Sequence, residues 1–378
     1  MKILVCGGGP AGLYFSILMK ARDAGHAITV CERDGADDTF GWGIVFSDQT
    51  FGYLEESDAP SYRAITSACQ LWDNVDVVHR GEAVTIRGNR FSGIGRLAFL
   101  KCLHQRCREL GVDVRFNTPA PDPSAHADYD LVVGADGARS AVRATYGAAF
   151  RPSLEQLRNK YIWLGTSKLF NGLTLIFRQS EVGVFIAHAY KFSPDRSTFI
   201  VECSPEAWSA AGLDAMSGDQ ACRYLEAVFA DDLQGASLLT NNFVKWMNFL
   251  LVKNRDWHHR QVVLLGDALH TAHFSIGSGT KLALEDAIAL ARAIDERPSV
   301  DDALLRFEET RRPGVDRLQS AAEESLSFFE QAGDYMDLDP VTFAYRLMLR
   351  SGRIDHEKLK RRDPAFVARY EALQVGTA

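Results

Sequence analysis

The chain has no excess of positive charge, which argues against a protein that binds nucleic acid. Its 378 residues include 42 lysines and arginines against 49 aspartates and glutamates, giving a formal net charge of −7. A nucleic-acid-binding surface needs clustered cations to neutralise phosphates. The composition therefore favours partners that are small molecules, and it still allows a local basic pocket for an anionic substrate.

The sequence also has no CxxC pair, and its seven cysteines are scattered along the chain. An odd number of scattered cysteines is typical of reduced, mostly buried thiols rather than of a disulfide framework or a metal site. We therefore expect a cytoplasmic protein with no bound metal.

A long apolar run is missing as well. No segment approaches the ~18–20 apolar residues of a membrane-spanning helix, and the sequence opens on a strand-like segment rather than a charged leader. We expect no membrane partner. Hydrophobic residues make up 46% of the chain and charged residues 24%, which is typical of a globular protein with a large core.

What is present is an alternation of short apolar strands and helices. Residues 2–6, 11–24 and 28–31 have the spacing of strand, helix and strand, which is one βαβ unit. A helix is predicted at 96–110, with strands at 112–116 and 129–133. A further strand at 261–265 is followed by a helix to about residue 294. The fold class predicted is α/β, with a Rossmann-like dinucleotide-binding domain.

The middle of the chain has a different pattern. Short segments rich in β-branched and aromatic residues predict strands, and we expect one mostly antiparallel sheet inserted into the α/β domain. The predicted domains are a discontinuous dinucleotide-binding domain (1–150 and 258–330), a β-sheet substrate domain (151–257 with parts of 40–92) and a helical C-terminal region (331–378). The predicted strands are 161–165, 173–177, 183–188 and 197–202.

A glycine-rich turn follows the first strand. Its G-x-G-x-x-G pattern permits a tight turn and lets the backbone approach a pyrophosphate at the start of a helix. A carboxylate at the end of the second strand, Glu32, can accept hydrogen bonds from ribose hydroxyls. Together these features predict a dinucleotide site but do not choose between FAD and NAD. The candidate residues of the turn are Gly7, Gly9, Pro10, Ala11 and Gly12.

Two later strands end in paired glycine and aspartate. One ends in Asp136-Gly137, and the other in Gly266-Asp267. The ends of strands in α/β folds bind ligands, so Asp267 is a candidate for a ribityl or ribose hydroxyl. After it, Gly277, Ser278 and Gly279 open a helix whose free N–H groups can stabilise negative charge on a reduced flavin.

The three motifs, in this order and spacing, resemble the FAD-dependent aromatic hydroxylases related to p-hydroxybenzoate hydroxylase, the group A flavin monooxygenases. The resemblance covers roughly residues 1–320. It implies FAD as cofactor, NADH or NADPH as reductant and O2 as oxidant. It also implies that Arg96 reaches the FAD pyrophosphate and that Arg33 lies near the adenine. At His273 the sequence departs from the family, because many members have proline there.

A closer resemblance appears in the connecting segments 38–50, 93–96, 162–170 and 270–281. These look like the hydroxylases of aryl-CoA thioesters, salicylyl-CoA 5-hydroxylase and the monooxygenase half of 2-aminobenzoyl-CoA monooxygenase/reductase. The resemblance implies 5-hydroxylation of salicylyl-CoA to gentisyl-CoA or of a related aryl-CoA. The violacein-pathway tryptophan hydroxylase is a more distant likeness. Hydroxylation of a free aromatic such as tryptophan or an indole therefore stays open, as does a non-hydroxylating FAD oxidoreductase.

The substrate site is the least defined by sequence. His188 and Tyr190 are two apart in a predicted strand and should share a face, although a buried structural histidine is as good an interpretation. Basic residues at 311–312 and 358–362 are candidates for CoA phosphates, although charge runs are usually solvated faces. We expect a monomer or homodimer. The catalytic candidates are His188 and His273, and the substrate candidates are Tyr161, Trp163, His188 and Tyr190.

Overall fold

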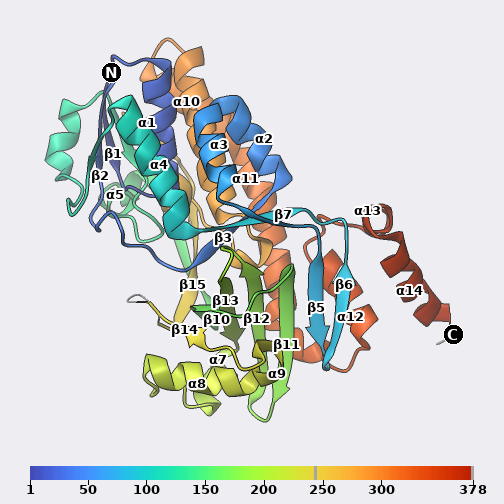
Figure 1. The fold of residues 1–378 in the computed structure, drawn as a ribbon. Helices are drawn as coiled ribbons and strands as arrows, with labels where there is room; N and C mark the ends of the chain where they lie inside the picture. The colour runs from blue at the N-terminus through green and yellow to red at the C-terminus, as the bar shows by residue number, and fades with distance from the viewer. Residues whose placement is uncertain (242–244, 376–378) are drawn as a thin grey trace.

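The computed structural model of the chain describes residues 1–241 and 245–375, in which the strands form three sheets (Figure 1). Residues 242–244 of the predicted β-sheet domain and 376–378 of the predicted C-terminal region lie outside this description. The mixture of helices and sheets confirms the predicted α/β class.

The first sheet has the strand order β16-β17-β9-β1-β2-β8. β1 lies inside it and pairs in parallel with β2 and β9. The inner strands β1, β9 and β17 are almost entirely apolar and buried, as is typical of parallel strands covered on both faces, whereas the edge strands β8 and β16 are polar and β16 pairs antiparallel with β17. The strands are β1 (Lys2–Cys6), β2 (Ala27–Cys31), β8 (Asp113–Arg115), β9 (Leu131–Gly134), β16 (His258–His259) and β17 (Val262–Leu264).

Four helices pack around this sheet and confirm the predicted strand–helix–strand opening. Helix α1 contacts both α4 and α10, and α10 contacts α11. Helix α4 has the predicted bounds, since Gly111 ends it with the left-handed φ of 76° that favours glycine. The bounds are α1 (Pro10–Arg22), α4 (Arg96–Leu110), α10 (Gly279–Glu296) and α11 (Val300–Glu330), with shorter helices α5 (Ala141–Thr145) and α6 (Gly147–Phe150).

The second sheet occupies the other half of the molecule (Figure 1). Its order is β14-β10-β13-β12-β11-β5-β6, with β15 also paired to β10. The predicted strands are present, but β10 is much longer than predicted and β11 pairs in parallel with β5. The bounds are β5 (Val75–His79), β6 (Glu82–Ile86), β10 (Pro152–Thr166), β11 (Leu173–Ser180), β12 (Gly183–Lys191), β13 (Ser197–Cys203), β14 (Leu238–Leu239) and β15 (Met247–Asn254).

Helices that the sequence pattern did not predict interrupt this β-rich region. Helix α8 begins with a capping box, in which Ser217 and Gln220 satisfy each other's backbone N–H groups. This cap was the signal for a helix inside a region assigned to strands. The helices are α7 (Pro205–Ala210), α8 (Gly218–Val228) and α9 (Ala230–Leu233).

A small third sheet and the C-terminal helices join the two halves. The small sheet has the order β3-β7-β4. Helix α11 is long enough to contribute Leu304 and Phe307 to the core of the first half and Phe328 and Phe329 to that of the second. The remaining elements are β3 (Gly43–Ser47), β4 (Gln70–Trp72), β7 (Phe91–Gly95), α2 (Asp48–Ser57), α3 (Ala59–Ser67), α12 (Pro340–Leu349), α13 (His356–Arg362) and α14 (Pro364–Val375).

Within the described ranges, no helix combines the length and the apolar character that crossing a membrane requires.

Candidate active site

A cavity of about 1710 Å³ is lined by both large sheets and by the α/β turns between them. It brings together most of the residues that the motifs singled out. Among the predicted residues, Gly12 and His273 do not line it. Those that do are Gly7, Gly9, Pro10, Ala11, Glu32, Arg33, Arg96, Asp136, Gly137, Tyr161, Trp163, His188, Tyr190, Asp267, Gly277, Ser278 and Gly279.

The glycine turn at the end of β1 depends on missing side chains. A Cβ on Gly7 would lie 2.3 Å from the carbonyl oxygen of Ala135, and one on Gly12 would lie 2.2 Å from the carbonyl oxygen of Gly7. Gly9, in contrast, faces open space and begins α1 without a side-chain cap. The first N–H groups of α1 therefore remain available to an anion in the cavity.

Glu32 lies beside this turn, just after β2. Its Oε2 accepts a hydrogen bond from the backbone N–H of Gly8 at 2.7 Å, and its Oε1 accepts one from Asp34 at 2.9 Å. These bonds fix the carboxylate at the cavity wall, while each oxygen keeps a further lone pair. The geometry suits a pair of ribose hydroxyls.

Asp136 lines the cavity and also stabilises the start of α5. Its carboxylate accepts hydrogen bonds from the backbone N–H groups of Ala141 at 2.7 Å and Val142 at 3.2 Å, at the start of α5. Nearby, the buried Arg143 donates to the carbonyl oxygen of Ala268 at 2.9 Å. This bond links the second motif to the third.

Asp267 and Arg96 present opposite charges to the same part of the cavity. Asp267 is exposed only to the cavity, and burial raises the pKa of its carboxyl group, with the charge of Arg96 opposing the rise. Burial likewise lowers the pKa of Arg96, whose Nε has no hydrogen-bond partner within the described chain. A buried unpaired guanidinium N–H is costly, so this pair fits a polar cofactor that supplies both an acceptor and hydroxyl donors.

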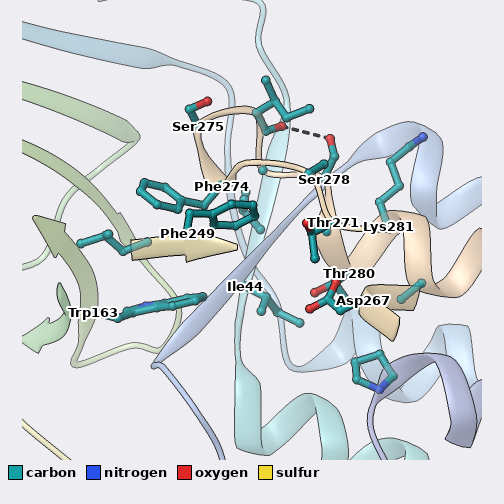
Figure 2. Close-up of a pocket in the computed structure, with 18 of the residues that line it drawn as sticks. Ile44, Trp163, Phe249, Asp267, Thr271, Phe274, Ser275, Ser278, Thr280 and Lys281 are labelled. Atoms are coloured by element: carbon teal, nitrogen blue, oxygen red, sulfur yellow. Dashed lines mark hydrogen bonds between the residues drawn. The ribbon is translucent and has the colours of Figure 1, made fainter. Parts of the chain in front are cut away.

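The N-terminus of α10 faces the same space. Gly277 has a left-handed φ of 59°, and Ser278 turns its hydroxyl back to the carbonyl oxygen of Ile276 at 3.1 Å instead of capping the helix (Figure 2). The first N–H groups of α10 are therefore free to meet negative charge. An anionic, reduced flavin ring fits this position.

On the other side of the cavity, one face of the second sheet forms an aromatic chamber. Strand register aligns Trp163 with Ile200 and Ile200 with His188, so these side chains form one row across the sheet. Figure 2 shows Trp163, Phe249 and Phe274 grouped on the side opposite Asp267. We define the aromatic chamber as Tyr161, Trp163, His188, Tyr190, Ile200, Phe249 and Phe274, all of which line the cavity.

The polar groups of the chamber are held in place. His188 Nε2 lies 2.7 Å from Glu202 Oε1, and the Tyr190 hydroxyl donates to the carbonyl oxygen of Gly43 at 2.8 Å. Burial would raise the pKa of Glu202, but the hydrogen bond and charge of His188 keep it below its ordinary value. Burial raises the pKa of Tyr161 to about 12, so this phenol stays neutral at neutral pH.

Comparison with known proteins assigns the family. The sequence profile described as FAD binding domain matches residues 108–322. The chain belongs to the FAD-binding domain family. It is 41% identical to a salicyloyl-CoA 5-hydroxylase from a Streptomyces species, over 98% of this chain and 73% of that protein. It is 39% identical to the 3-hydroxy-4-methyl-anthranilyl-[aryl-carrier protein] 5-monooxygenase of Streptosporangium sibiricum, over 88% of this chain and 90% of that one.

Other relatives agree on the reaction type and the fold. The chain is 37% identical to the protodeoxyviolaceinate monooxygenase of Chromobacterium violaceum, over 91% of this chain and 92% of that protein. A solved variant of 2-methyl-3-hydroxypyridine-5-carboxylic acid oxygenase shares the fold with a TM-score of 0.70 at 20% identity, covering 95% of both chains. This FAD-binding family member is an FAD-dependent aromatic-ring monooxygenase that uses NAD(P)H, as the sequence motifs predicted.

His273 lies behind the chamber rather than in its wall. Its ring packs against Phe274 with centroids 4.1 Å apart and against Phe249 at 5.1 Å. Its Nδ1 accepts a weak hydrogen bond from the N–H of Ser275 at 3.4 Å. Burial lowers the pKa of His273 to about 4, so the ring is neutral near pH 7.

The basic residues that the sequence suggested for CoA phosphates divide into two groups. Arg311 forms ion pairs with Glu285 and Asp286, and Arg312 with Glu308, so both arginines are paired with carboxylates of the protein, and neither lines the cavity. Lys358 and Arg362, from the second basic run, do line it.

Sequence reasoning missed several residues of the site. Glu202 carried a signal, because it is the acidic residue in a strand whose other members are apolar or small. Phe249, Phe274, Arg350 and Arg353 had none, since their place depends on how distant segments pack. Among the residues that the structure describes, no cluster of three or more histidine, cysteine or acidic side chains could hold a metal ion.

Asp267→Ala should weaken FAD binding. The substitution removes the carboxylate that faces the cavity opposite the unpaired Arg96, and we expect a loss of about 2 kcal/mol, or roughly thirtyfold in Kd. Titration of the apoprotein with FAD, followed by fluorescence, measures the effect. Asp214→Ala, at an exposed position, is the control and should bind FAD normally. Unchanged affinity in Asp267→Ala would remove Asp267 from the cofactor site.

His273→Gln should change how stability depends on pH. The folded pKa of about 4 lies below the ordinary 6.5, so between these values the unfolded chain binds a proton that the folded protein does not. The folded state therefore loses about 1.4 kcal/mol per pH unit as pH falls through this window. Urea denaturation at several pH values should show a shallower slope for His273→Gln. Equal slopes in the wild type and in His273→Gln would contradict a buried neutral His273.

Proposed function

We propose that this monooxygenase hydroxylates salicylyl-CoA at ring position 5 to give gentisyl-CoA. The observation that carries the proposal is the His188–Glu202 pair in the wall of the aromatic chamber. It offers a proton acceptor to a phenol, and salicylate carries a phenol beside its thioester. The two relatives of highest identity reported above support it, since the names of both specify position 5 of an aryl group joined to a carrier.

The reaction balances as an exchange of C–H for C–OH. One oxygen atom of O2 enters the ring, the other leaves as water, and NAD(P)H with a proton provides the two electrons. FAD, when bound, supplies the electron transfer and the activation of O2. The protein must supply the rest: it must bind and orient the ring, exclude water and accept one proton from the substrate.

The residues proposed to hold FAD are those of the three motifs. Glu32 receives the ribose and Arg33 lies near the adenine. Arg96 and Asp267 meet the pyrophosphate and ribityl chain. The N-termini of α1 and α10 meet the pyrophosphate and the pyrimidine edge of the ring. The full set is Gly7, Gly9, Pro10, Ala11, Gly12, Glu32, Arg33, Arg96, Asp136, Gly137, Asp267, Gly277, Ser278 and Gly279, with Gly12 acting through the close packing of the turn.

We propose that the two large sheets belong to two domains with different functions. Residues 1–150 and 258–330 form the FAD-binding domain, and 151–257 with parts of 40–92 form the substrate domain. The proposed helical C-terminal region, 331–378, contributes residues between Met348 and Arg362 to the cavity wall.

His188 is the proposed general base. With its Nε2–H donated to the carboxylate of Glu202, the lone pair of Nδ1 is left to accept the phenolic proton of the substrate. Loss of that proton raises electron density at the carbon para to the oxygen, which is position 5 of a salicylyl ring. Phe249, Phe274 and Trp163 enclose the ring and keep water out.

A hydroxylase of a free aromatic compound is the second candidate. The relative from Chromobacterium violaceum favours it, because its name contains no carrier. The candidates differ in one measurable property, the dependence of turnover on the thioester.

Purified, FAD-loaded protein should oxidise NADH or NADPH faster in the presence of salicylyl-CoA. We expect a product heavier by one oxygen atom, since only the ring C–H is exchanged, and mass spectrometry of the hydrolysed product identifies it. Benzoyl-CoA, which lacks the phenol, is the control and should not be hydroxylated. Stimulation by tryptophan or an indole but not by salicylyl-CoA would replace the proposal with the second candidate.

His188→Gln should retain FAD but lower kcat about a hundredfold at neutral pH, the lower end of the range for general bases. The loss should shrink for a salicylyl thioester with a more acidic phenol, because such a ring needs less help to ionise. A purely structural role would not produce that dependence. His258→Gln, in the other sheet, should behave as wild type. Unchanged turnover in His188→Gln would leave His188 as a packing residue.

A further inference from the structure

The cavity extends beyond the aromatic chamber to a second group of charged residues. From the chamber it continues along the apolar side chains of Val75, Leu173 and Leu175, at the starts of β5 and β11. It then reaches the turn between β6 and β7 and the segment that leads into α13. We call the cationic side chains that line this end the basic end of the cavity: Arg90, Arg353, Lys358 and Arg362.

At this end of the cavity, ion pairs with carboxylates neutralise few of the positive charges. Among the described residues, the acidic side chains that line the cavity (Glu32, Asp34, Asp136 and Asp267) all lie in or beside the motifs at the end proposed for FAD. Lys358 lies 3.3 Å from Asp355, but Arg362 donates to the uncharged amide oxygen of Asn89 at 2.9 Å. Neither Arg90 nor Arg353 forms an ion pair with a carboxylate of the described residues.

The neighbouring positive charges affect the pKa of Arg353. Burial lowers the pKa of its guanidinium, and the charge of Arg362 lowers it further. Arg350, which also lines the cavity, has its pKa lowered to about 10 by burial; the charge of Glu202 opposes this change and that of Arg353 adds to it. Like charges so placed repel one another, and an anion that binds between them would relieve the repulsion.

The part of the described cavity wall formed by β10, by the start of β15 and by the residues just before it has less positive charge. Its residues Gln156, Lys245, Trp246 and Met247 include one cation, Lys245. A substrate with a highly charged tail would therefore place that tail at the basic end rather than here.

The distance from the chamber to the basic end requires a linker. His188 lies on β12, and β11 and then β5 follow it across the sheet. Neighbouring strands are about 4.8 Å apart, so a ring beside His188 is roughly 10 Å from the β5 edge before any charge is reached. The apolar side chains along this path leave no charged partner for the linker, which must be long and uncharged.

We propose that the basic end of the cavity binds the phosphates of coenzyme A, with the pantetheine arm lying along Val75, Leu173 and Leu175 and the acyl ring in the aromatic chamber. This inference rests on the proposed function. Phosphopantetheine on a carrier protein shares the same chemistry, but it carries one phosphate diester. Four cations match the several phosphate charges of free coenzyme A better.

The binding test uses coenzyme A itself, without an acyl group. Calorimetric titration of the FAD-loaded protein should show tighter binding of coenzyme A than of pantetheine. The double variant Arg353→Gln/Lys358→Gln should weaken coenzyme A binding about tenfold, the loss expected for about one charge-assisted hydrogen bond, and leave pantetheine binding unchanged. Arg361→Gln is the matched control, because Arg361 lies on α13 without lining the cavity. Full retention of flavin absorbance in each variant excludes a folding defect.

The kinetic test compares salicylyl-CoA with salicylyl-pantetheine. In the double variant, KM for salicylyl-CoA should rise about tenfold with kcat and the KM for salicylyl-pantetheine unchanged. Added salt should raise only the KM of the coenzyme A thioester, because ions screen exposed charges.

Four outcomes would overturn the inference. They are equal KM values of the wild type for the two thioesters, unchanged coenzyme A binding in the double variant, a rise in the KM for NAD(P)H instead of the thioester, and turnover of a carrier-bound acyl group in preference to salicylyl-CoA. Failure of the proposed function would look different, since neither thioester would be hydroxylated while a free aromatic compound was.

Discussion

The structure depends on a contact between two backbones that admits no side chain. Gly7 and Gly12 bring the end of β1 and the start of α1 against Ala135, at the end of β9, at distances that a Cβ would occupy. Hydrogen bonds then join the neighbouring ends, from Ala135 N–H to the carbonyl of Cys6 at 2.8 Å and from Leu265 N–H to that of Gly134 at 2.9 Å. Because the three strands are parallel and end together, motifs that are far apart in sequence meet at one edge of the sheet. The cavity begins at that edge.

Two neighbouring carboxylates at the third motif show how the protein separates structure from binding. Asp286 is fully enclosed, accepts the N–H of Gly266 at 3.1 Å and the Nε–H of Arg311 at 2.8 Å, and lies 2.9 Å from His270. Burial would raise the pKa of Asp286, but the charges of His270 and Arg311 hold it below its ordinary value. This network holds the turn on the side away from the cavity, so Asp267 can face the cavity with no hydrogen bond or ion pair to the described residues of the protein.

The parts of the fold that the sequence could predict are those encoded locally. The glycine turn, Glu32 and helix α4 each carry their own signals within a few residues, and the structure has them where they were expected. The segment 35–90 could not be assigned to helices and strands, because β5 is defined by pairing with β11, about a hundred residues later, and β6 by pairing with β5. Glu202 pairs with Ile186 in the register of β12 and β13, which places it diagonal to His188 and within hydrogen-bond distance of its ring. The basic end of the cavity is the extreme case, since Arg362 meets Asn89 across 273 positions of sequence.

The acidic residues that line the described cavity lie at one end of it, and this orients whatever enters. These carboxylates, with Arg96 and helix N-termini beside them, suit the hydroxyls and pyrophosphate of the FAD proposed to bind there, whereas the other end has cations and no lining carboxylate. Between them the chamber offers aromatic surface and a single buried pair, His188 and Glu202, whose hydrogen bond leaves one ring nitrogen for an exchangeable proton. A molecule with an apolar ring, one acidic hydroxyl and a distant anionic tail would satisfy all three regions in one orientation only. In the opposite orientation, this molecule would place its negative charges beside Asp267 and Glu32, and the cations at the basic end of the cavity would have no anion beside them. In the proposed complex, the distribution that selects the molecule would therefore also fix which carbon of its ring faces the flavin.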